Sequence, residues 1–529
     1  MDRKNSYNLT VALLGMVAGI LLTLLITQIV SSRPVRVSGR EWSKLNVVLN
    51  TVSRDYVDSI DYKSVTEDVL AEALSMLDPH SLYFPPVEFK AVEEDLAGNF
   101  EGIGIQFNVP NDTAIVLDVI PGGPAEKVGM MKGDRILKVD TVGIAGVKYP
   151  QDSMVRRMKG PAGTKVAIHV NRDGVDIPFT IVRGKIPVNS IDAAFMLNPQ
   201  TGYIRLSKFA ATTGKEFLQE STSLQKQGMK NLILDLRDNS GGYLDQAIIL
   251  SDLFLSEGRT IVYTEGLHSP RQDYKADGKG NLKDVGLSVL INENSASSSE
   301  ILAGAIQDND RGVIIGRRSF GKGLVQKSIN FSDGSGMRLT VARFHTPSGR
   351  CIQKPYGEDY SYDVYKRYVD GELVDADSIK VNKNDSYKTV GGRTVYGGGG
   401  IIPDVFVPMD TTKVTSFYLQ LSRKATLMRF ASAYFDAHKK ELSEIDDFDV
   451  LDAYLDKAGL DRKLISYALV QDGIKLSSQA EWEQSQPYLM TQVRALVGRY
   501  SKLGDKAFYR IHSAIDTTIQ EALKPHSID

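Results

Sequence analysis

A regular alternation of short apolar strands with helical segments, from about residue 186 to residue 410, constrains the fold of this chain most strongly. Apolar runs of four to eight residues that alternate with helix-length segments are typical of a sheet covered by helices. The alternation therefore predicts an α/β core. The expected strands are 232–236, 287–291, 313–315 and 338–342, and the expected helices are 243–255 and 299–306.

The segment from Val289 to Gln326 combines a serine-rich turn and a helix with one lysine in a glycine-rich strand. A serine hydroxyl is a weak nucleophile that needs an adjacent base, and lysine can be that base only as the neutral amine. Apolar neighbours would bury Lys322 and lower its pKa from about 10.4. Gln326 would share a strand face with it and orient it. Ser297 precedes the helix, whose free N–H groups could stabilise an oxyanion.

The same residues also fit a purely structural role. Ser297 followed by Glu300 before an apolar run has the pattern of a capping box. A lysine between Gly321 and Gly323 is also common in a solvated turn. The residues alone therefore leave catalysis and helix capping both open.

Eight blocks, in order, resemble the C-terminal processing (tail-specific) peptidases, which are serine endopeptidases with a Ser–Lys dyad. The resemblance covers roughly residues 40 to 410, and it implies that Ser297 is the nucleophile, Lys322 the base and Gln326 the orienting group. The choice of Ser297 over its neighbouring serines rests on this resemblance. His345 is the rival base. The blocks are Asp78–Phe89, Phe100–Phe107, Val119–Asp140, Gly202–Phe209, Leu232–Ile248, Val289–Gln326, Phe344–Gln353 and Gly399–Pro408.

The resemblance further implies an oxyanion hole made of backbone N–H groups. The loop Arg237-Asp-Asn-Ser-Gly-Gly resembles the one that supplies the first N–H, from Gly241 or Gly242, and Ser298 would supply the second. Glycine suits a backbone that must approach a substrate carbonyl closely. The family usually has proline where this chain has Ser240. A plain tight turn after a buried strand is the alternative reading of this loop.

Residues about 99 to 185 resemble a PDZ domain. Gly102, Ile103, Gly104 and Ile105 would form the loop whose backbone N–H groups bind a peptide carboxylate. The strand from Ile105 to Val109 could accept a peptide as an added strand. The resemblance thus implies protein or peptide substrates with apolar C-termini as partners. An ordinary β-rich domain with glycine turns is the alternative.

The stretch Leu9–Val30 has 22 residues and no charge, which is long enough to span a bilayer. It predicts an uncleaved signal anchor over residues 1–32, with a cleaved signal peptide as the alternative. Basic residues lie on both sides of it, so they do not settle its orientation. The resemblance favours a bacterial inner-membrane protein with its catalytic body on the periplasmic side.

The expected organisation is an α/β, ClpP/crotonase-like peptidase core over 186–410 with an inserted PDZ-like domain. Helical segments are expected at 40–95 and 411–529, and 373–396 is expected to be an exposed insertion. The C-terminal helices could form an oligomer interface, dock an adaptor or brace the core. A net charge of −2 suggests no nucleic-acid partner, and one cysteine excludes an internal disulfide framework.

The predicted function is a membrane-anchored serine endopeptidase that reads apolar C-terminal tails and cleaves envelope proteins through an acyl-enzyme. It needs no cofactor, and the seven histidines show no metal-binding spacing. The main alternative is a non-catalytic PDZ chaperone or adaptor of the cell envelope. A crotonase-type acyl-transfer enzyme is a further alternative, disfavoured because the sequence has no nucleotide-binding signature.

Overall fold

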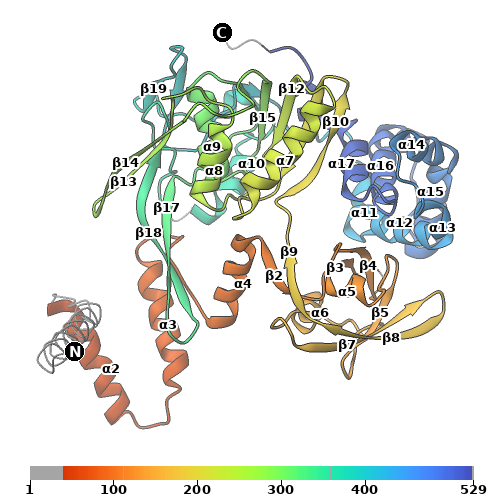
Figure 1. Cartoon of the computed structure of the whole chain (residues 1–529), viewed down its shortest axis with the longest axis horizontal. Helices are drawn as coiled ribbons and strands as arrows, with labels where there is room; N and C mark the ends of the chain where they lie inside the picture. The colour runs from red at the N-terminus through yellow and green to blue at the C-terminus, as the bar shows by residue number, and fades with distance from the viewer. Residues whose placement is uncertain (1–39, 111, 358–359, 527–529) are drawn as a thin grey trace, which may run out of the picture. The chain divides into compact units, whose positions relative to one another are not determined.

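The computed structural model describes residues 40–110, 112–357 and 360–526 (Figure 1). The chain divides into two compact units between Leu70 and Ala71. The first contains α2 (Arg40–Asp55) and the beginning of α3 (Tyr62–Ser75). The predicted membrane segment, Leu9–Val30, lies outside the described residues. Within the described ranges, no helix combines the length and the apolar character needed to cross a bilayer.

A six-stranded, mostly parallel sheet forms the centre of the second unit, as the alternation predicts. Its strand order is β10-β11-β12-β15-β16-β21, and only β10 runs antiparallel to its neighbour. The predicted α/β core is therefore confirmed. The strands are β10 (Ile191–Asn198), β11 (Thr201–Leu206), β12 (Asn231–Asp235), β15 (Gly286–Ile291), β16 (Val313–Gly316) and β21 (Val405–Phe406).

Both faces of this sheet are buried. Successive side chains of a strand point to opposite sides, so neighbouring residues pack in different clusters. Leu232 and Leu234 pack in the cluster formed with α7 (Thr213–Lys226), α8 (Leu244–Asp252) and α9 (Ser298–Asp308) (Figure 1). Ile233 packs on the opposite face in a cluster that includes Ile519 of α18 (Thr517–Ala522). The end of the C-terminal helical region thus braces the core, one of its three predicted roles.

A second sheet brings the block Asp78–Phe89 beside the strand that follows Lys322 and carries Gln326. Here β18 (Gly336–His345) pairs with β1 (Leu82–Phe84), β17 (Leu324–Asn330) and β13 (Thr260–Gly266), which in turn pairs with β14 (Ser269–Lys275). The register places Leu82 opposite Arg338, which in turn lies opposite Ser328 of β17. Segments far apart in the sequence therefore meet at one site.

The PDZ-like segment forms a separate antiparallel sheet whose first strand has one open edge. Among the described residues, the strand β3 (Ile105–Asn108) pairs only with β4 (Ala114–Val119) and lies at the end of the order β3-β4-β5-β7-β8. The remaining strands are β5 (Arg135–Val139), β6 (Val142–Gly143), β7 (Lys165–Arg172) and β8 (Val175–Val182), with helices α5 (Pro124–Lys127) and α6 (Gln151–Met158). The strands β2 (Asn99–Gly102) and β9 (Gly184–Pro187) pair where this segment joins the core.

The C-terminal helices form their own hydrophobic core and also contact the PDZ-like sheet. The Lys132 amine donates to the carbonyls of Arg499 and Ser501 at 2.9 and 3.0 Å. Burial lowers the pKa of Lys132 to about 8. The helices are α11 (Ser416–Arg423), α12 (Thr426–Ala437), α13 (Lys439–Leu442), α14 (Phe448–Lys457), α15 (Leu460–Asp472), α16 (Gln479–Gly498) and α17 (Asp505–Ser513), followed by α18.

The prediction that 373–396 is an exposed insertion is wrong in part. Leu373 and Val395 are buried, and the segment forms a hairpin of β19 (Ser386–Lys388) and β20 (Thr394–Tyr396). Arg393 pairs with Asp310 and Asp404 of the core at 2.7 and 2.6 Å. These ion pairs attach the hairpin to the core. The polar, glycine-rich composition of the segment gave no sign of them.

Candidate active site

Ser297 lies at the N-terminal cap of α9 in a strained backbone conformation. Its φ is 55° and its ψ is −114°, a region that non-glycine residues rarely occupy. Such a conformation costs on the order of 1–3 kcal/mol and persists only where the surroundings enforce it. The strain is therefore a reason to look for function at this serine.

The hydroxyl groups distinguish Ser297 from its neighbours, which the sequence could not do without the family resemblance. The hydroxyls of Ser295, Ser298 and Ser299 donate to the carbonyls of Leu236, Gly242 and Asn239 at 2.8, 3.0 and 2.9 Å. All three side chains are fully buried, whereas Ser297 is partly exposed. Ser297 and Glu300 form the predicted capping box. Among the described residues, no backbone carbonyl accepts from the Ser297 hydroxyl, so its proton stays available to a base.

Lys322 and Gln326 are brought together as predicted, but the prediction that they share a strand is wrong, since Lys322 lies in the loop before β17 (Leu324–Asn330). The Lys322 amine donates to Gln326 Oε1 at 3.0 Å, and Gln326 Nε2 donates to the carbonyl of His80 at 2.5 Å. Burial lowers the pKa of Lys322, and the charge of Arg338 lowers it further. In the part of the chain that is described, no hydrogen bond joins the Lys322 amine to the Ser297 hydroxyl. Catalytic hydrogen bonds are often long in ligand-free enzymes and tighten when substrate binds.

The carboxylate of Glu300 connects the start of α9, which carries Ser297, to the loop that carries Lys322. The backbone N–H groups of Ser297 and Lys322 donate to Glu300 Oε2 at 2.9 and 2.8 Å. The structure therefore places the two predicted dyad residues on either side of one side chain. The sequence identified Glu300 only as half of a capping box.

The loop Arg237–Gly242 packs directly against the nucleophile. Gly241 has a φ of 102°, and a Cβ on it would lie 2.8 Å from Ser297 Cβ and 2.9 Å from the Ser298 nitrogen. Of the three predicted oxyanion donors, Gly241 is already engaged, since its N–H donates to Asn239 Oδ1 at 2.9 Å. The N–H groups of Gly242 and Ser298 have no partner among the described residues. These two remain as the candidate oxyanion hole.

Buried ion pairs of Asp235 and Arg237 hold this loop in place. The Asp235 carboxylate accepts from Arg237 and Arg205, which hold its pKa well below the ordinary value despite its burial. Arg237 also pairs with Asp516 at 2.8 Å, at the start of α18. The C-terminal helices are thus connected to the loop that carries Gly241.

His80, which the sequence did not single out, lies beside Gln326, since its carbonyl accepts from the Gln326 amide. His345, the predicted rival base, stacks on Tyr263 and contacts the carbonyl of Gly349 at 3.1 Å. The ring of His80 contacts the Tyr360 hydroxyl at 2.7 Å. Burial lowers the pKa of His80 to about 4, and the charge of Lys322 contributes. With this pKa His80 is neutral at pH 7 and is only a weak base.

We expect the cleavage rate to rise with pH along a limb that belongs to Lys322. The base is active only when deprotonated, so its lowered pKa moves this limb below the ordinary lysine value of 10.5. Because the pKa of His80 is about 4, no second limb near 6.5 is expected from it. The measurement is kcat/KM against pH for wild type and for His80→Gln. A limb near 6.5 that disappears in His80→Gln would contradict this assignment.

The predicted peptide-binding loop is held by its carbonyl groups. The carbonyls of Ile103 and Gly104 accept from Ala125 and Ile120 at 2.8 and 3.0 Å. Gly104 has a φ of 81°, which favours glycine. The loop leads into Ile105 and the open edge of β3. This arrangement leaves a strand edge to which an extended peptide can add.

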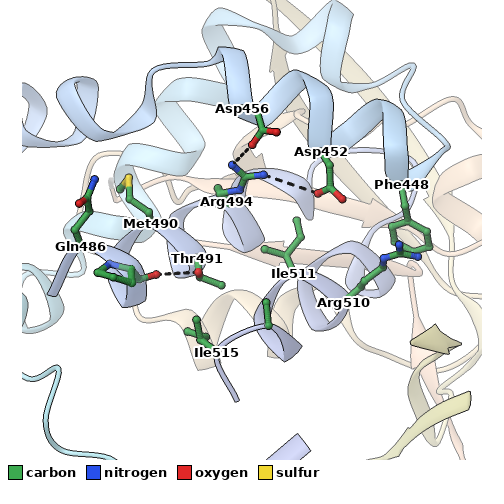
Figure 2. Close-up of a pocket in the computed structure, with 12 residues that line it drawn as sticks. Phe448, Asp452, Asp456, Gln486, Met490, Thr491, Arg494, Arg510, Ile511 and Ile515 are labelled. Atoms are coloured by element: carbon green, nitrogen blue, oxygen red, sulfur yellow. Dashed lines mark hydrogen bonds and ion pairs between the residues drawn. The ribbon is translucent and has the colours of Figure 1, made fainter. Parts of the chain in front are cut away.

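A cavity of about 620 Å³ lies in the C-terminal helices (Figure 2), and neither Ser297 nor Lys322 lines it. Arg494 lines it and pairs with Asp452 and Asp456 at 3.9 and 2.6 Å (Figure 2). It holds no nucleophile with an adjacent base. Among the described residues, no group of His, Cys, Asp and Glu is arranged to hold a metal.

Three family models match this chain. Residues 200–362 match peptidase family S41, residues 102–182 match the PDZ domain, and residues 417–501 match a family of unknown function (DUF8443). The chain is 33% identical over 349 residues to the carboxy-terminal processing protease CtpA of Bacillus subtilis (strain 168), covering 65% of this chain and 74% of the relative. It is 36% identical over 348 residues to the carboxy-terminal-processing protease of Bartonella bacilliformis, covering 64% and 79%.

Solved structures include similar chains. The photosystem II D1 C-terminal processing protease is 28% identical, with a TM-score of 0.37 and coverage of 70% of this chain and 87% of that one. The PDZ domain of a Vibrio cholerae carboxy-terminal protease, solved in complex with a peptide, is 33% identical. It covers 17% of this chain and 99% of that one, with a TM-score of 0.16.

Proposed function

Because this chain belongs to peptidase family S41, as a carboxy-terminal processing serine protease with a PDZ domain, we propose that Ser297 and Lys322 form its catalytic dyad. Gln326 orients the lysine. The N–H groups of Gly242 and Ser298 stabilise the oxyanion. The PDZ domain binds the C-terminal tail of the protein to be cleaved, and Ser297 attacks a bond upstream of that tail.

A single observation carries this proposal: Glu300 accepts hydrogen bonds from the backbone of both Ser297 and Lys322. The backbones of two residues 25 positions apart are thereby held by one carboxylate oxygen; Ser297 has a strained backbone, and the pKa of Lys322 is lowered. A capping serine and a solvated turn lysine would need neither feature. Perturbed titratable groups beside a strained nucleophile favour catalysis over the structural alternative.

The proposed reaction assigns one step to each of these groups. The neutral Lys322 amine takes the proton from the Ser297 hydroxyl as its oxygen attacks the carbonyl carbon of the scissile bond. Negative charge develops on the carbonyl oxygen, where the Gly242 and Ser298 N–H groups donate to it. The lysine returns the proton to the leaving amine, and an acyl-enzyme remains. Water, deprotonated by the same amine, then releases the acyl group.

The open edge of β3 supports a tail-reading role for the PDZ domain. A peptide added as a strand would bond to the backbone of β3, while the loop at Gly102–Ile105 faces its terminal carboxylate. We propose that apolar tails are preferred, as the family resemblance implies.

An unfolded reporter that ends in an apolar tail is expected to disappear faster than the same reporter with an acidic tail. Loss is expected only with the wild-type chain and not with Ser297→Ala. Both proteins would be incubated in full-length form in detergent, with cleavage followed by gel and mass spectrometry. Equal rates for the two tails would contradict tail selection, and cleavage by Ser297→Ala would contradict the nucleophile assignment.

We also propose that Leu9–Val30 anchors the enzyme in a bacterial inner membrane, with the body on the periplasmic side and envelope proteins as substrates. The support is the length of this uncharged stretch and the family resemblance. The check is fractionation of cells followed by protease treatment of spheroplasts. Recovery of the intact chain in the soluble fraction would contradict the anchor.

A further inference from the structure

We propose that Tyr360 is a positioning residue for the peptidase reaction: through His80 it holds the Gln326 amide in the orientation that the base requires. This inference rests on the proposed Ser297–Lys322 dyad. Tyr360 lies in none of the eight blocks that carry the family resemblance, so the sequence gives it no role.

A chain of hydrogen bonds connects the lysine to Tyr360. The Lys322 amine donates to Gln326 Oε1 at 3.0 Å, and Gln326 Nε2 donates to the carbonyl of His80 at 2.5 Å. The His80 ring in turn contacts the Tyr360 hydroxyl through Nε2 at 2.7 Å. The tyrosine is therefore linked to the base through two intermediate residues.

Gln353 closes this chain of hydrogen bonds and sets its direction. The N–H of Gly323, next to Lys322, can only donate, so the Gln353 atom that faces it at 2.9 Å is Oε1. The Gln353 NH₂ therefore faces Tyr360 and donates to its oxygen at 3.2 Å. This leaves the Tyr360 proton for Nε2 of His80, whose ring then carries its own proton on Nδ1.

Both side chains keep these protonation states at neutral pH. Burial raises the pKa of Tyr360 to about 12, so its hydroxyl keeps the proton. Burial lowers the pKa of His80 to about 4, so its Nε2 remains an acceptor. Of the charged groups that face His80, Lys322 and Lys354 lower its pKa further and Asp78 raises it. The contact between the two rings is thus a hydrogen bond between neutral groups.

The orientation of the Gln326 amide decides how Lys322 can act. The carbonyl of His80 only accepts, so Gln326 turns its NH₂ toward it and presents Oε1 to the lysine. Oε1 takes one N–H of the neutral amine and leaves the lone pair for the Ser297 proton. If the His80 carbonyl moved away, the amide could rotate and offer its NH₂ to that lone pair. Holding His80 in place therefore keeps the base available.

Contacts of its ring fix Tyr360 independently of its hydroxyl. Tyr360 is 7% exposed, and its ring meets those of His80 and Phe320 edge to face, with centroids 5.4 and 6.2 Å away. The Lys354 ammonium lies 4.3 Å from the centroid of the Tyr360 ring and 3.8 Å from that of Phe320. Tyr360→Phe keeps all these contacts and removes only the hydrogen bonds of the hydroxyl.

The test compares Tyr360→Phe, Gln326→Ala and the double variant with wild type in the full-length chain. The measurements are kcat and KM on a peptide, together with thermal unfolding. Tyr356→Phe is the matched control, because Tyr356 lies in the same segment and its hydroxyl has no hydrogen bond to another described residue. Ser297→Ala is included to test the dyad itself.

We expect Tyr360→Phe to lose about 10-fold in kcat with little change in KM, the size of effect that one hydrogen bond has. The loss stays below the roughly 10²-fold that a misplacement of about 1 Å can cost. The reason is that Asp78 also holds the turn, through the N–H of His80 at 2.8 Å. Because Tyr360 acts through Gln326, Tyr360→Phe should cost nothing further in the Gln326→Ala background. Tyr356→Phe should resemble wild type.

Three results would overturn the inference. The first is wild-type kcat in Tyr360→Phe or in Gln326→Ala. The second is a loss in Tyr360→Phe that is equally large with and without Gln326, because this would indicate an effect on the fold rather than on the base. The third is a loss that appears in KM alone.

Should Tyr360→Phe fail to fold, Gln353→Glu decides. This variant keeps an acceptor for the Gly323 N–H but has no donor for Tyr360, so the tyrosine proton can turn away from His80. A lower kcat at unchanged KM supports the inference, and wild-type kcat overturns it. Failure of the dyad has a different signature: if Ser297→Ala still cleaves the peptide, the dyad assignment falls, whatever the other variants do.

Discussion

Replacement of Lys322 by alanine is expected to reduce kcat by at least about 10³-fold while leaving the fold intact. General base catalysis contributes about 10²- to 10⁴-fold, and a serine without a base is a very weak nucleophile. The fold should survive, because the Lys322 side chain bonds only to Gln326 among the described residues. Burial lowers the pKa of its amine, so truncation also removes a group that is costly to bury in its charged form.

The measurement is single-turnover cleavage of a peptide, together with thermal unfolding. Lys327→Ala is the control, since Lys327 lies on β17, which follows Lys322, has an exposed side chain and should leave the rate unchanged. Two residues that act as a unit show non-additive losses, so Ser297→Ala/Lys322→Ala should be no slower than Ser297→Ala. Cleavage by Lys322→Ala near the wild-type rate would instead require another base.

The α/β core could be predicted because its signal is local. Strands such as Asn231–Asp235 and Gly286–Ile291 are apolar on both faces, as strands covered by helices on each side must be. The core strands can therefore be predicted without knowing which distant segments of the chain lie side by side. The geometry of a continuous strand predicts the pairing of Lys322 with Gln326, but Lys322 precedes β17 and the register of β17 shifts between Val325 and Gln326, so the pairing forms for another reason.

The rest of the site depends on contacts that no local pattern encodes. His80 reaches Gln326 only because the segment leading into β1 is held beside β18, some 250 residues away. Glu300 accepts from the backbone N–H groups of both Ser297 and Lys322 because the segment 319–322 packs against the start of α9. The N–H of Gly241 is occupied by the side chain of Asn239 two residues earlier, which a count of glycines cannot reveal.

Gly241→Ala is expected to lower kcat by about 10²- to 10³-fold, as the loss of an oxyanion donor does. A methyl group at this position would lie 2.8 Å from both the Ala296 carbonyl oxygen and Ser297 Cβ, and 2.9 Å from the Ser298 nitrogen. These are backbone atoms and a Cβ that cannot rotate away, so the loop or the nucleophile segment must shift. Either shift separates the Gly242 N–H from the Ser298 N–H. The binding of the substrate tail to the distant PDZ domain should be unaffected.

Gly228→Ala is the matched control for backbone strain. Gly228 has a φ of 99°, close to the 102° of Gly241, but the nearest atom to an added Cβ is the Pro199 carbonyl oxygen at 3.5 Å. Both variants force alanine into the left-handed region and should lose about 1 kcal/mol or more of unfolding free energy. Only Gly241→Ala should also lose kcat. Equal loss of activity in the two variants would show that strain alone is responsible, and the loop would then have no part in holding the oxyanion.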